Sequence, residues 1–231
     1  MSHGRQTRWM LFRRKEKWAL TPLAWGIVLL AVAGIIFWWG RAVPSFLAMT
    51  EPVQADALVV EGWLPDHALA EAITEFRSRP YQCLITTGGP IDAGEVLAGY
   101  QTYAALSAAT LSRLGMDSTK IVAVPAPRLR ANRTFASALS LSRWLKISGA
   151  KVHSFNLYSL GVHTRRSRLL FQKALGNSVP VGCIAAKDLS YDPDRWWRYS
   201  SGVEAIVFES VGYFYVKVLF PLSAEHAFNT D

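Results

Sequence analysis

An uncharged apolar run near the N-terminus constrains this chain more than any other feature. Residues 18–40 contain no Asp, Glu, Lys or Arg. Residues 18–39 would form a helix about 33 Å long at ~1.5 Å per residue, which is enough to cross a hydrocarbon core of ~30 Å. Tryptophans at both ends suit the aromatic belts of the two membrane interfaces: Trp18, Trp25, Trp38 and Trp39. We therefore predict a transmembrane helix over residues 18–40.

A buried core helix and a cleaved signal peptide are the two other readings of this run. A core helix seldom extends this far without one charge. A signal peptide has an apolar stretch of about 7–15 residues that ends at a small-x-small site. This run is longer and closes on Phe37, Trp38 and Trp39. An uncleaved anchor is the better interpretation.

The basic residues of the chain are concentrated before this run. Six of the 25 Lys and Arg fall in residues 1–17, against the single acid Glu16. The rest of the chain has 19 basic and 16 acidic residues, so its net charge is +3 compared with +8 for the whole chain. This distribution argues against a nucleic-acid partner. Only Arg41 follows the run closely, and the positive-inside rule then places residues 1–17 in the cytoplasm as a basic tail. We expect the remaining chain to face outward, into a periplasm where the cell has one.

Beyond a linker over residues 41–53, short apolar runs alternate with helical segments. The hydrophobic content of 51% and the charged content of 18% exclude a disordered chain. Alternation of this kind predicts a parallel sheet covered on both faces. For residues 54–221 we expect a Rossmann-like three-layer α/β domain with a mostly parallel five-stranded sheet, and a C-terminal tail over residues 222–231. The strands are expected at residues 55–60, 83–87, 121–124, 151–158 and 179–185. The helices are expected at 66–77, 134–147, 163–175 and 193–220, with a further, longer helical region after the second strand that ends at residue 114.

Residues 201–220 are apolar enough to suggest a second membrane span. Glu204, Glu209 and Lys217 interrupt them, and each would be costly in lipid. We expect instead one long helix that packs on the sheet.

The two cysteines, Cys83 and Cys183, fall in expected strands two and five. In a doubly wound sheet these strands usually lie on opposite sides of strand one. Because a disulfide needs Cα atoms within about 7 Å, we predict that the two thiols are not bonded.

Candidate binding residues follow the expected strands, because ligands of open α/β sheets bind beyond the carboxyl ends of the strands. Cations, hydroxyls and glycines prevail there, and Glu61 is the only carboxylate. Such an edge favours phosphate or another anion. The residues are Glu61, Gly62 and Trp63; Thr86, Thr87, Gly88 and Gly89; Arg128, Arg130, Asn132, Arg133 and Thr134; and Ser159, His163, Arg165 and Arg166.

Ordinary structural roles compete with each of these assignments. Gly88 and Gly89 are also what a simple turn requires, Thr134 is also a natural N-cap, and a histidine such as His163 at a helix start is often a structural donor. The dinucleotide fingerprint, the Walker loop and the nucleophile elbow are absent from the sequence. The aspartates over residues 188–194 suit a turn better than a metal site, so we predict no metal.

Several short motifs, taken in order, resemble the SanA/YdcF/ElyC-like family of bacterial envelope proteins over about residues 54–220. The matching pieces are ADALVVEGW (55–63), LITTGG (84–89), LSRLGMD (111–117), Arg-Thr-x-x-Ser (133–137) and His-x-x-Arg-Ser (163–167), with Trp196-Trp197-Arg198 and Glu209 as looser matches. The resemblance implies a bacterial inner-membrane protein with a role in peptidoglycan, surface polysaccharide or lipid-carrier handling.

Together these features predict a bilayer-anchored domain that binds or processes an anionic envelope precursor, such as a lipid-linked sugar. If it is an enzyme, we expect phosphoester hydrolysis or transfer; the cofactor stays open. The alternatives are a non-catalytic binding module for a nucleotide-like small molecule, an assembly factor and a purely structural anchor. We expect strands three and four to be neighbours and therefore to bring the site together around one cavity. In this site Arg133 and Arg166 would clamp the ligand, and Gly88, Gly89 and Thr134 would make close contacts with it, with Gly62 and Trp63 beside them. His163 would act as the acid/base, and Glu61 would orient a water or His163.

Overall fold

The computed structural model describes residues 21–92, 99–129 and 132–220. The chain divides into two compact units, residues 1–40 and 41–231. The predicted basic tail (1–17), the first residues of the apolar run (18–20), Arg130 and the C-terminal tail (222–231) lie outside the described residues.

Helix α1 (Pro22–Leu47) covers most of the apolar run. One stretch of this 26-residue helix has a mean hydropathy of 2.1, and none of its residues is buried. By its length and composition the helix can cross a membrane. It is the only such helix in the described part of the chain. It also extends seven residues beyond the predicted end at residue 40, so the expected linker begins as helix, and Val43 and Leu47 are buried.

A five-stranded sheet forms the centre of the second unit, in the order β3-β2-β1-β4-β5. The strands are β1 (Ala57–Glu61), β2 (Cys83–Gly88), β3 (Ile121–Pro125), β4 (Phe155–Leu160) and β5 (Val181–Ala186). Every neighbouring pair is parallel, which confirms the predicted fold class. Two strands, β1 and β4, separate β2 from β5, and Cys83 and Cys183 are free as predicted.

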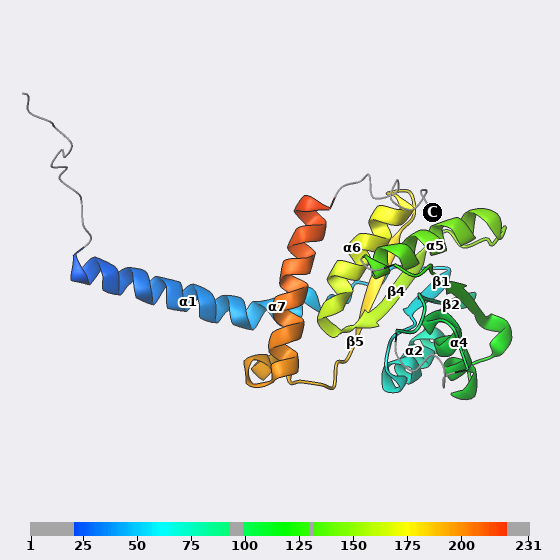
Figure 1. The fold of residues 1–231 in the computed structure, drawn as a ribbon, viewed down its shortest axis with the longest axis horizontal. Helices are drawn as coiled ribbons and strands as arrows, with labels where there is room; N and C mark the ends of the chain where they lie inside the picture. Colours follow the sequence, from blue (N-terminus) through cyan, green and yellow to red (C-terminus); the bar gives the residue numbers. More distant parts are fainter. Residues whose placement is uncertain (1–20, 93–98, 130–131, 221–231) are drawn as a thin grey trace, which may run out of the picture. The chain divides into compact units, whose positions relative to one another are not determined.

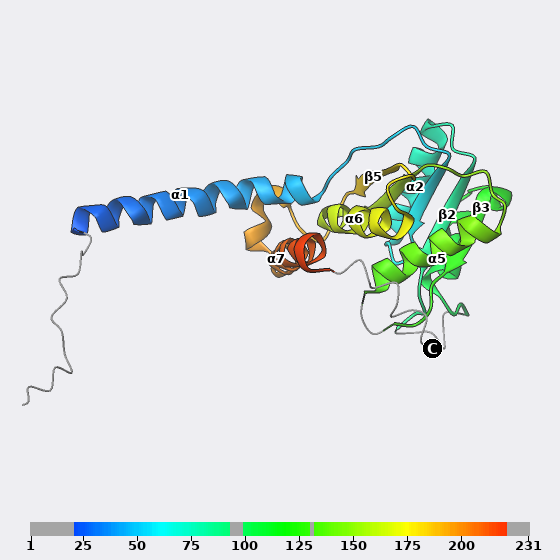
Figure 2. The same cartoon turned by 90° about the horizontal axis from the view of Figure 1, so that it is seen from above.

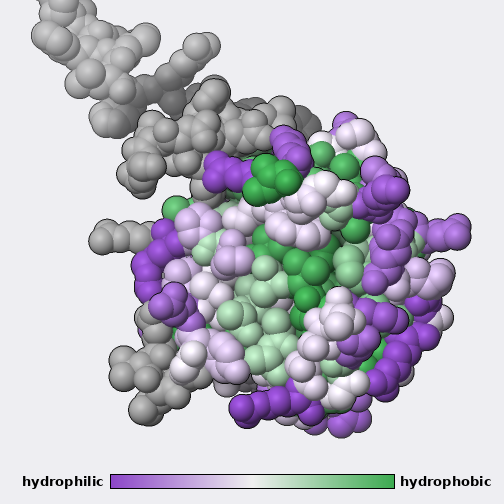
Figure 3. All heavy atoms as spheres, turned by 90° about the vertical axis from the view of Figure 1, so that its right-hand side faces the viewer, coloured by the Kyte–Doolittle hydropathy of each residue, from purple (hydrophilic) through white to green (hydrophobic). Residues whose placement is uncertain are grey.

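Helices cover both faces of the sheet, as the alternating pattern predicts (Figures 1 and 2). On one face, α5 (Arg133–Ile147) and α6 (Thr164–Leu175) bury Leu141 and Phe171 against Val59 and Leu157. On the other face, α2 (Asp66–Ser78) and α4 (Tyr103–Arg113) pack over the alternate strand residues. Figure 3 shows one side of this domain, where hydrophilic side chains surround a more hydrophobic middle.

The crossover from β3 to β4 differs from the sequence expectation. β3 and β4 are not neighbours, because β2 and β1 lie between them. The chain instead returns through α5 to the far side of β1, where α5 packs beside α6. The direction of winding therefore reverses between β1 and β4, and this is the switch point at which such sheets bind ligands.

The predicted single helix over residues 193–220 is three helical pieces. A 3-10 segment η3 (Pro193–Arg198) precedes α7 (Ser200–Phe214), and a π-helical turn η4 (Tyr215–Leu219) follows it. Tyr199 lies between η3 and α7, and its extended backbone separates these two helical segments. Only the far end of this region reaches the sheet core, through Val216 and Phe220, whereas Ile206 packs with Val43 and Leu47.

Candidate functional site

A cavity of about 570 Å³ opens at the carboxyl edge of the sheet. This volume lies within the range of small-molecule sites, about 300–1,000 Å³. The ends of β1 and β2, the loop after β3, and the starts of α5 and α6 all contribute to its wall. Residues of α7 and η4 complete it: Phe208, Glu209, Gly212, Tyr215 and Val216.

Of the nine residues that were assigned a role in the predicted site, eight line this cavity. Glu61, Trp63, Gly88, Gly89, Arg133, Thr134, His163 and Arg166 line it. They meet because α5 returns across the sheet and packs beside α6, and not because β3 and β4 are adjacent.

Gly62 is the exception, and its role is packing. Its N–H donates to the Thr87 carbonyl at 2.6 Å. A Cβ at this position would lie 2.5 Å from the carbonyl oxygen of Tyr103. Glycine is required here so that β1 can approach the start of α4.

Arg165 does not reach the cavity, whereas Thr134 lines it as predicted without capping its helix. Arg165 points away from the cavity, and its guanidinium carbon lies 3.9 Å from the centre of the Phe46 ring. Thr134 is the second residue of α5, whose N-cap position is occupied by Asn132 in a left-handed conformation with φ 57°. Thr134 is therefore not the N-cap.

Glu61 ends β1 and is buried, at 3% exposure. Ser159, on neighbouring β4, donates a short hydrogen bond to Oε2. Ser167, on α6, donates to Oε1 at 3.1 Å. Burial alone would raise the pKa of Glu61, but the charge of His163 and these hydrogen bonds outweigh it and lower the pKa. Glu61 is thus an anion held at the switch point.

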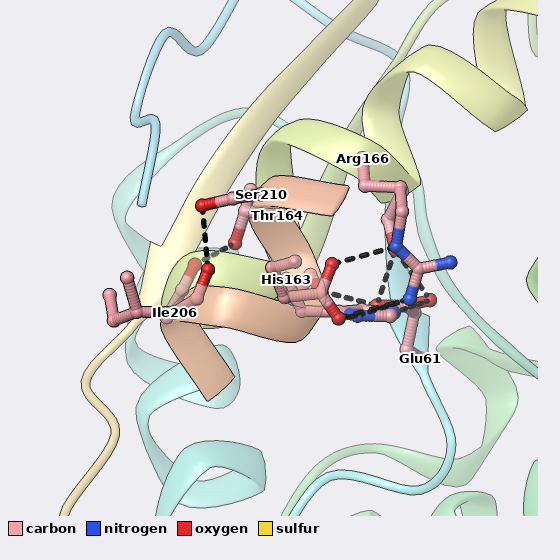
Figure 4. Close-up of polar contacts among 10 residues, drawn as sticks. Glu61, His163, Thr164, Arg166, Ile206 and Ser210 are labelled. Atoms are coloured by element: carbon pink, nitrogen blue, oxygen red, sulfur yellow. Dashed lines mark hydrogen bonds and ion pairs between the residues drawn. The ribbon is translucent and has the colours of Figure 1, made fainter. Parts of the chain in front are cut away.

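His163 lies between two carboxylates (Figure 4). Its Nδ1 is 2.7 Å from Glu209 Oε1, and its Nε2 is 3.7 Å from Glu61 Oε1. Because an ionised carboxylate only accepts hydrogen bonds, Nδ1 carries a proton towards Glu209. Burial would lower the pKa of His163, but the charge of Glu61 and the hydrogen bond to Glu209 raise it to about 9. His163 is therefore a cation at neutral pH, and Trp63 packs edge-on against its ring at 5.1 Å.

Arg166 binds Glu209 through two hydrogen bonds. Its Nε lies 2.7 Å from Oε2, and a terminal nitrogen lies 3.0 Å from Oε1. Burial would raise the pKa of Glu209, but the hydrogen bonds from His163 and Arg166 lower it to about 2. The pair joins α6 to α7, so the charge of Arg166 is already compensated by a carboxylate.

Glu209 and Asp92 correct the expectation that Glu61 is the only carboxylate at this edge. Both line the cavity, and Asp92 forms an exposed ion pair with Arg133. Sequence reasoning missed Glu209 as a site residue, although a lone carboxylate within the apolar residues 205–216 is a signal that it is buried with a partner.

The described lining residues carry nearly balanced charges. Arg128, Arg133, Arg166 and protonated His163 give four positive charges, while Glu61, Asp92 and Glu209 give three negative ones. Two buried polar atoms, Thr87 Oγ1 and His163 Nε2, have no hydrogen-bond partner among the described residues. Such atoms are uncommon in folded proteins and mark sites of ligand or water binding.

Among the residues with defined positions, no group of three or more His, Cys, Asp or Glu side chains is arranged to hold a metal ion. At neutral pH His163 also cannot act as a general base, because its ring is already protonated. What the arrangement offers is a proton donor, buried charge and hydrogen-bonding capacity for a polar ligand.

These features define a Rossmann-like α/β domain with a ligand-sized cavity at the switch point of its sheet. Both the fold and the geometry of the site assign the domain to this structural class. No protein-family model matches this chain, and no curated protein matches it significantly.

Proposed function

We propose that this chain is a single-pass inner-membrane protein whose α/β domain binds or processes an anionic envelope precursor. The anchor is α1, with the N-terminus cytoplasmic and the domain extracytoplasmic. The ligand carries a phosphate or diphosphate, as in a lipid-linked sugar. This is the role implied by the resemblance to the SanA/YdcF/ElyC-like family, of which we propose the chain is a member.

The observation that carries the proposal is the pair of unsatisfied buried atoms in a cavity whose described lining residues have a net charge of only +1. Thr87 Oγ1 and His163 Nε2 both belong to residues that line the cavity. α5 also begins at its wall, and the N-terminus of a helix favours anions. Arg133, 68% exposed at its side chain, can exchange its surface partner Asp92 for a phosphate, because exposed ion pairs contribute little.

If the ligand is processed, His163 is the acid. At neutral pH it holds a proton that it can give to a leaving-group oxygen. In hydrolysis, water attacks phosphorus and forms the new P–O bond as the bond from phosphorus to the leaving oxygen breaks. The leaving oxygen takes the proton of His163 and departs as an alcohol or phosphate, and the attacking water releases a proton to solvent, from which His163 is reprotonated. Glu61 and Glu209 act by keeping His163 charged and oriented.

A binding module without catalysis is the second candidate, for a nucleotide-like molecule or in assembly. The observation that favours it is that the two buried carboxylates already accept several hydrogen bonds each. Glu61 accepts from two serines, and Glu209 accepts from both His163 and Arg166. Neither carboxylate has the freedom that activation of a water requires.

Binding to the full chain in lipid nanodiscs tests both candidates. The probes are an isoprenyl diphosphate, the matching isoprenol and ADP, with empty nanodiscs as the blank. We expect the diphosphate to bind at least about tenfold more tightly than the alcohol, a difference of ~1.4 kcal/mol. Tighter binding of ADP would favour the second candidate. Phosphate release in the same samples separates processing from binding.

Two arginine variants on one helix serve as a matched pair. Arg133→Ala should weaken diphosphate binding about tenfold, consistent with loss of one charge-assisted contact at ~1.5 kcal/mol. Arg143→Ala removes an exposed arginine of α5 that does not line the cavity, and should leave binding unchanged. Equal affinity for diphosphate and alcohol in the wild-type chain would refute a phosphate-specific site.

A further inference from the structure

Helix α7 presents an apolar face to the outside of the domain. Phe208, Val211 and Phe214 are 65%, 66% and 61% exposed. Its carboxylate Glu209, by contrast, is buried. The usual distribution of a surface helix is reversed, with charge inside and large apolar side chains outside. The exposed apolar residues of α7 and of the following turn η4, which together we call the outer face of α7, are Val203, Val207, Phe208, Val211, Phe214, Tyr215, Val218 and Leu219.

The outer face lies along one side of the helix. At ~100° per residue, its five members in α7 fall within an arc of about 140°, and its other members lie in the π-helical turn η4. Glu204 is the one charged residue in that arc, and Lys217 lies at its margin, with Nζ 5.6 Å from the centre of the Tyr213 ring. Contiguous exposed apolar surfaces of this kind mark interaction sites.

The chain itself indicates which partner covers this face. Val43 and Leu47 pack in one cluster with Ile206 of α7, and the Phe46 ring meets Tyr213 at 5.6 Å. Val43 is four residues beyond Trp39, and four residues reach at most ~14 Å. If Trp39 lies at the membrane interface, α7 cannot lie far from that interface.

We propose that the outer face of α7 lies in the interfacial layer of the bilayer that α1 spans. It is a second membrane contact, made by an interfacial helix whose polar side faces the protein instead of water. Aromatic residues at such a face suit the headgroup level. The inference rests on the membrane anchor of the proposed function, but not on the identity of the ligand.

This placement would bring the cavity to the lipid surface. Phe208 and Tyr215 belong to the outer face and also line the cavity. A ligand with a hydrophobic chain would then reach the cavity with its polar end while the chain stayed in lipid. A water-soluble ligand would gain nothing from this arrangement.

Nitroxide labels on the full chain in proteoliposomes test the contact. In a Cys83→Ala, Cys183→Ala background, one label each replaces Val211 on the outer face, Ile147 at the end of α5 and Ile36 on α1. All three positions are exposed, at 66%, 83% and 63%. We expect the ratio of collisions with oxygen to collisions with a water-soluble nickel chelate to be severalfold higher at Val211→Cys and Ile36→Cys than at Ile147→Cys.

Each other outcome counts against the contact, and the outcomes are distinguishable. A label at Val211→Cys in water, with Ile36→Cys in lipid, overturns the contact and leaves the anchor. A label at Ile36→Cys in water overturns the anchor and the contact together. Spin–spin broadening at Val211→Cys that disappears on dilution with unlabelled chain means that a second copy covers the face. Val218→Cys, 59% exposed on the same face, repeats the test if Val211→Cys does not fold.

Discussion

His163 owes its charge to residues that are distant in sequence. Burial works against the charged form, and the two carboxylates Glu61 and Glu209 restore it. The rule that strand ends meet at one edge could predict Glu61, His163 and Arg166 as neighbours. It could not predict Glu209, because a carboxylate on an apolar helix does not reveal which way it points. That direction is decided by the packing of α7.

Loss of the Glu209 charge should destabilise the protein. Glu209→Gln leaves Arg166, which is 16% exposed at its side chain, without its anionic partner, and breaking a buried pair costs about 3–5 kcal/mol. Thermal unfolding of the full chain measures the effect. Glu204→Gln, exposed on the same helix, should change stability by less than ~0.5 kcal/mol. Equal effects of the two substitutions would show that the buried network contributes nothing.

Stability should also fall on the alkaline side because of His163. Its pKa is raised from 6.5 to about 9 in the folded protein. A raised pKa means that protonation favours the folded state; this contribution is complete below pH 6.5 and is lost as the pH rises through 9. The difference in unfolding free energy between wild type and His163→Gln should shrink by up to ~3 kcal/mol across that interval. A difference that stays constant from pH 6 to pH 10 would contradict the charge assignment.

At the scale of elements, periodicity predicted which segments are helices and strands better than where they end. β4 begins at Phe155 and not at residue 151, because Asp56 accepts hydrogen bonds from the backbone N–H groups of His153 and Ser154. The last helix breaks at Tyr199, which is extended. Such interruptions depend on side-chain and packing contacts that an apolar pattern does not contain.

Gly62 provides a test of packing at the junction of β1 and α4. Gly62→Ala places a methyl group against the Tyr103 carbonyl, and overpacking of this kind costs about 1–3 kcal/mol. Gly34→Ala is the control, since nothing lies within 4 Å of its Cβ position. Thermal unfolding should separate the two variants. If Gly62→Ala were as stable as Gly34→Ala, the close approach would not constrain the fold.

At the scale of the molecule, the alternation of apolar runs and helices was enough to predict a parallel sheet with helices on both faces. It did not predict the route of the chain between β3 and β4, because local pattern carries no information on which strands become neighbours. The convergence of Arg133 with His163 was therefore expected for the wrong reason. The return of α5 to the side of α6 produces it.

Topology is the remaining prediction at this scale. Six basic residues precede Trp18, and only Arg41 follows the apolar run closely, which favours a cytoplasmic N-terminus. A reporter that is active only outside the cytoplasm should work when fused after Asp231. A reporter active only in the cytoplasm, at the same position, should fail. The reverse pattern would overturn the proposed localisation.

Glu209 also sets the rotation of α7 about its own axis. A helix that is apolar on nearly every side has no amphipathic pattern to choose the side that faces the protein, and many rotational settings would bury similar area. Only one setting delivers Glu209 to Arg166 and His163, and any other would leave Arg166 without its anionic partner. The contacts of this single residue thus determine the orientation of the whole helix. The outward positions are free to exchange among apolar residues, because none of them decides the angle.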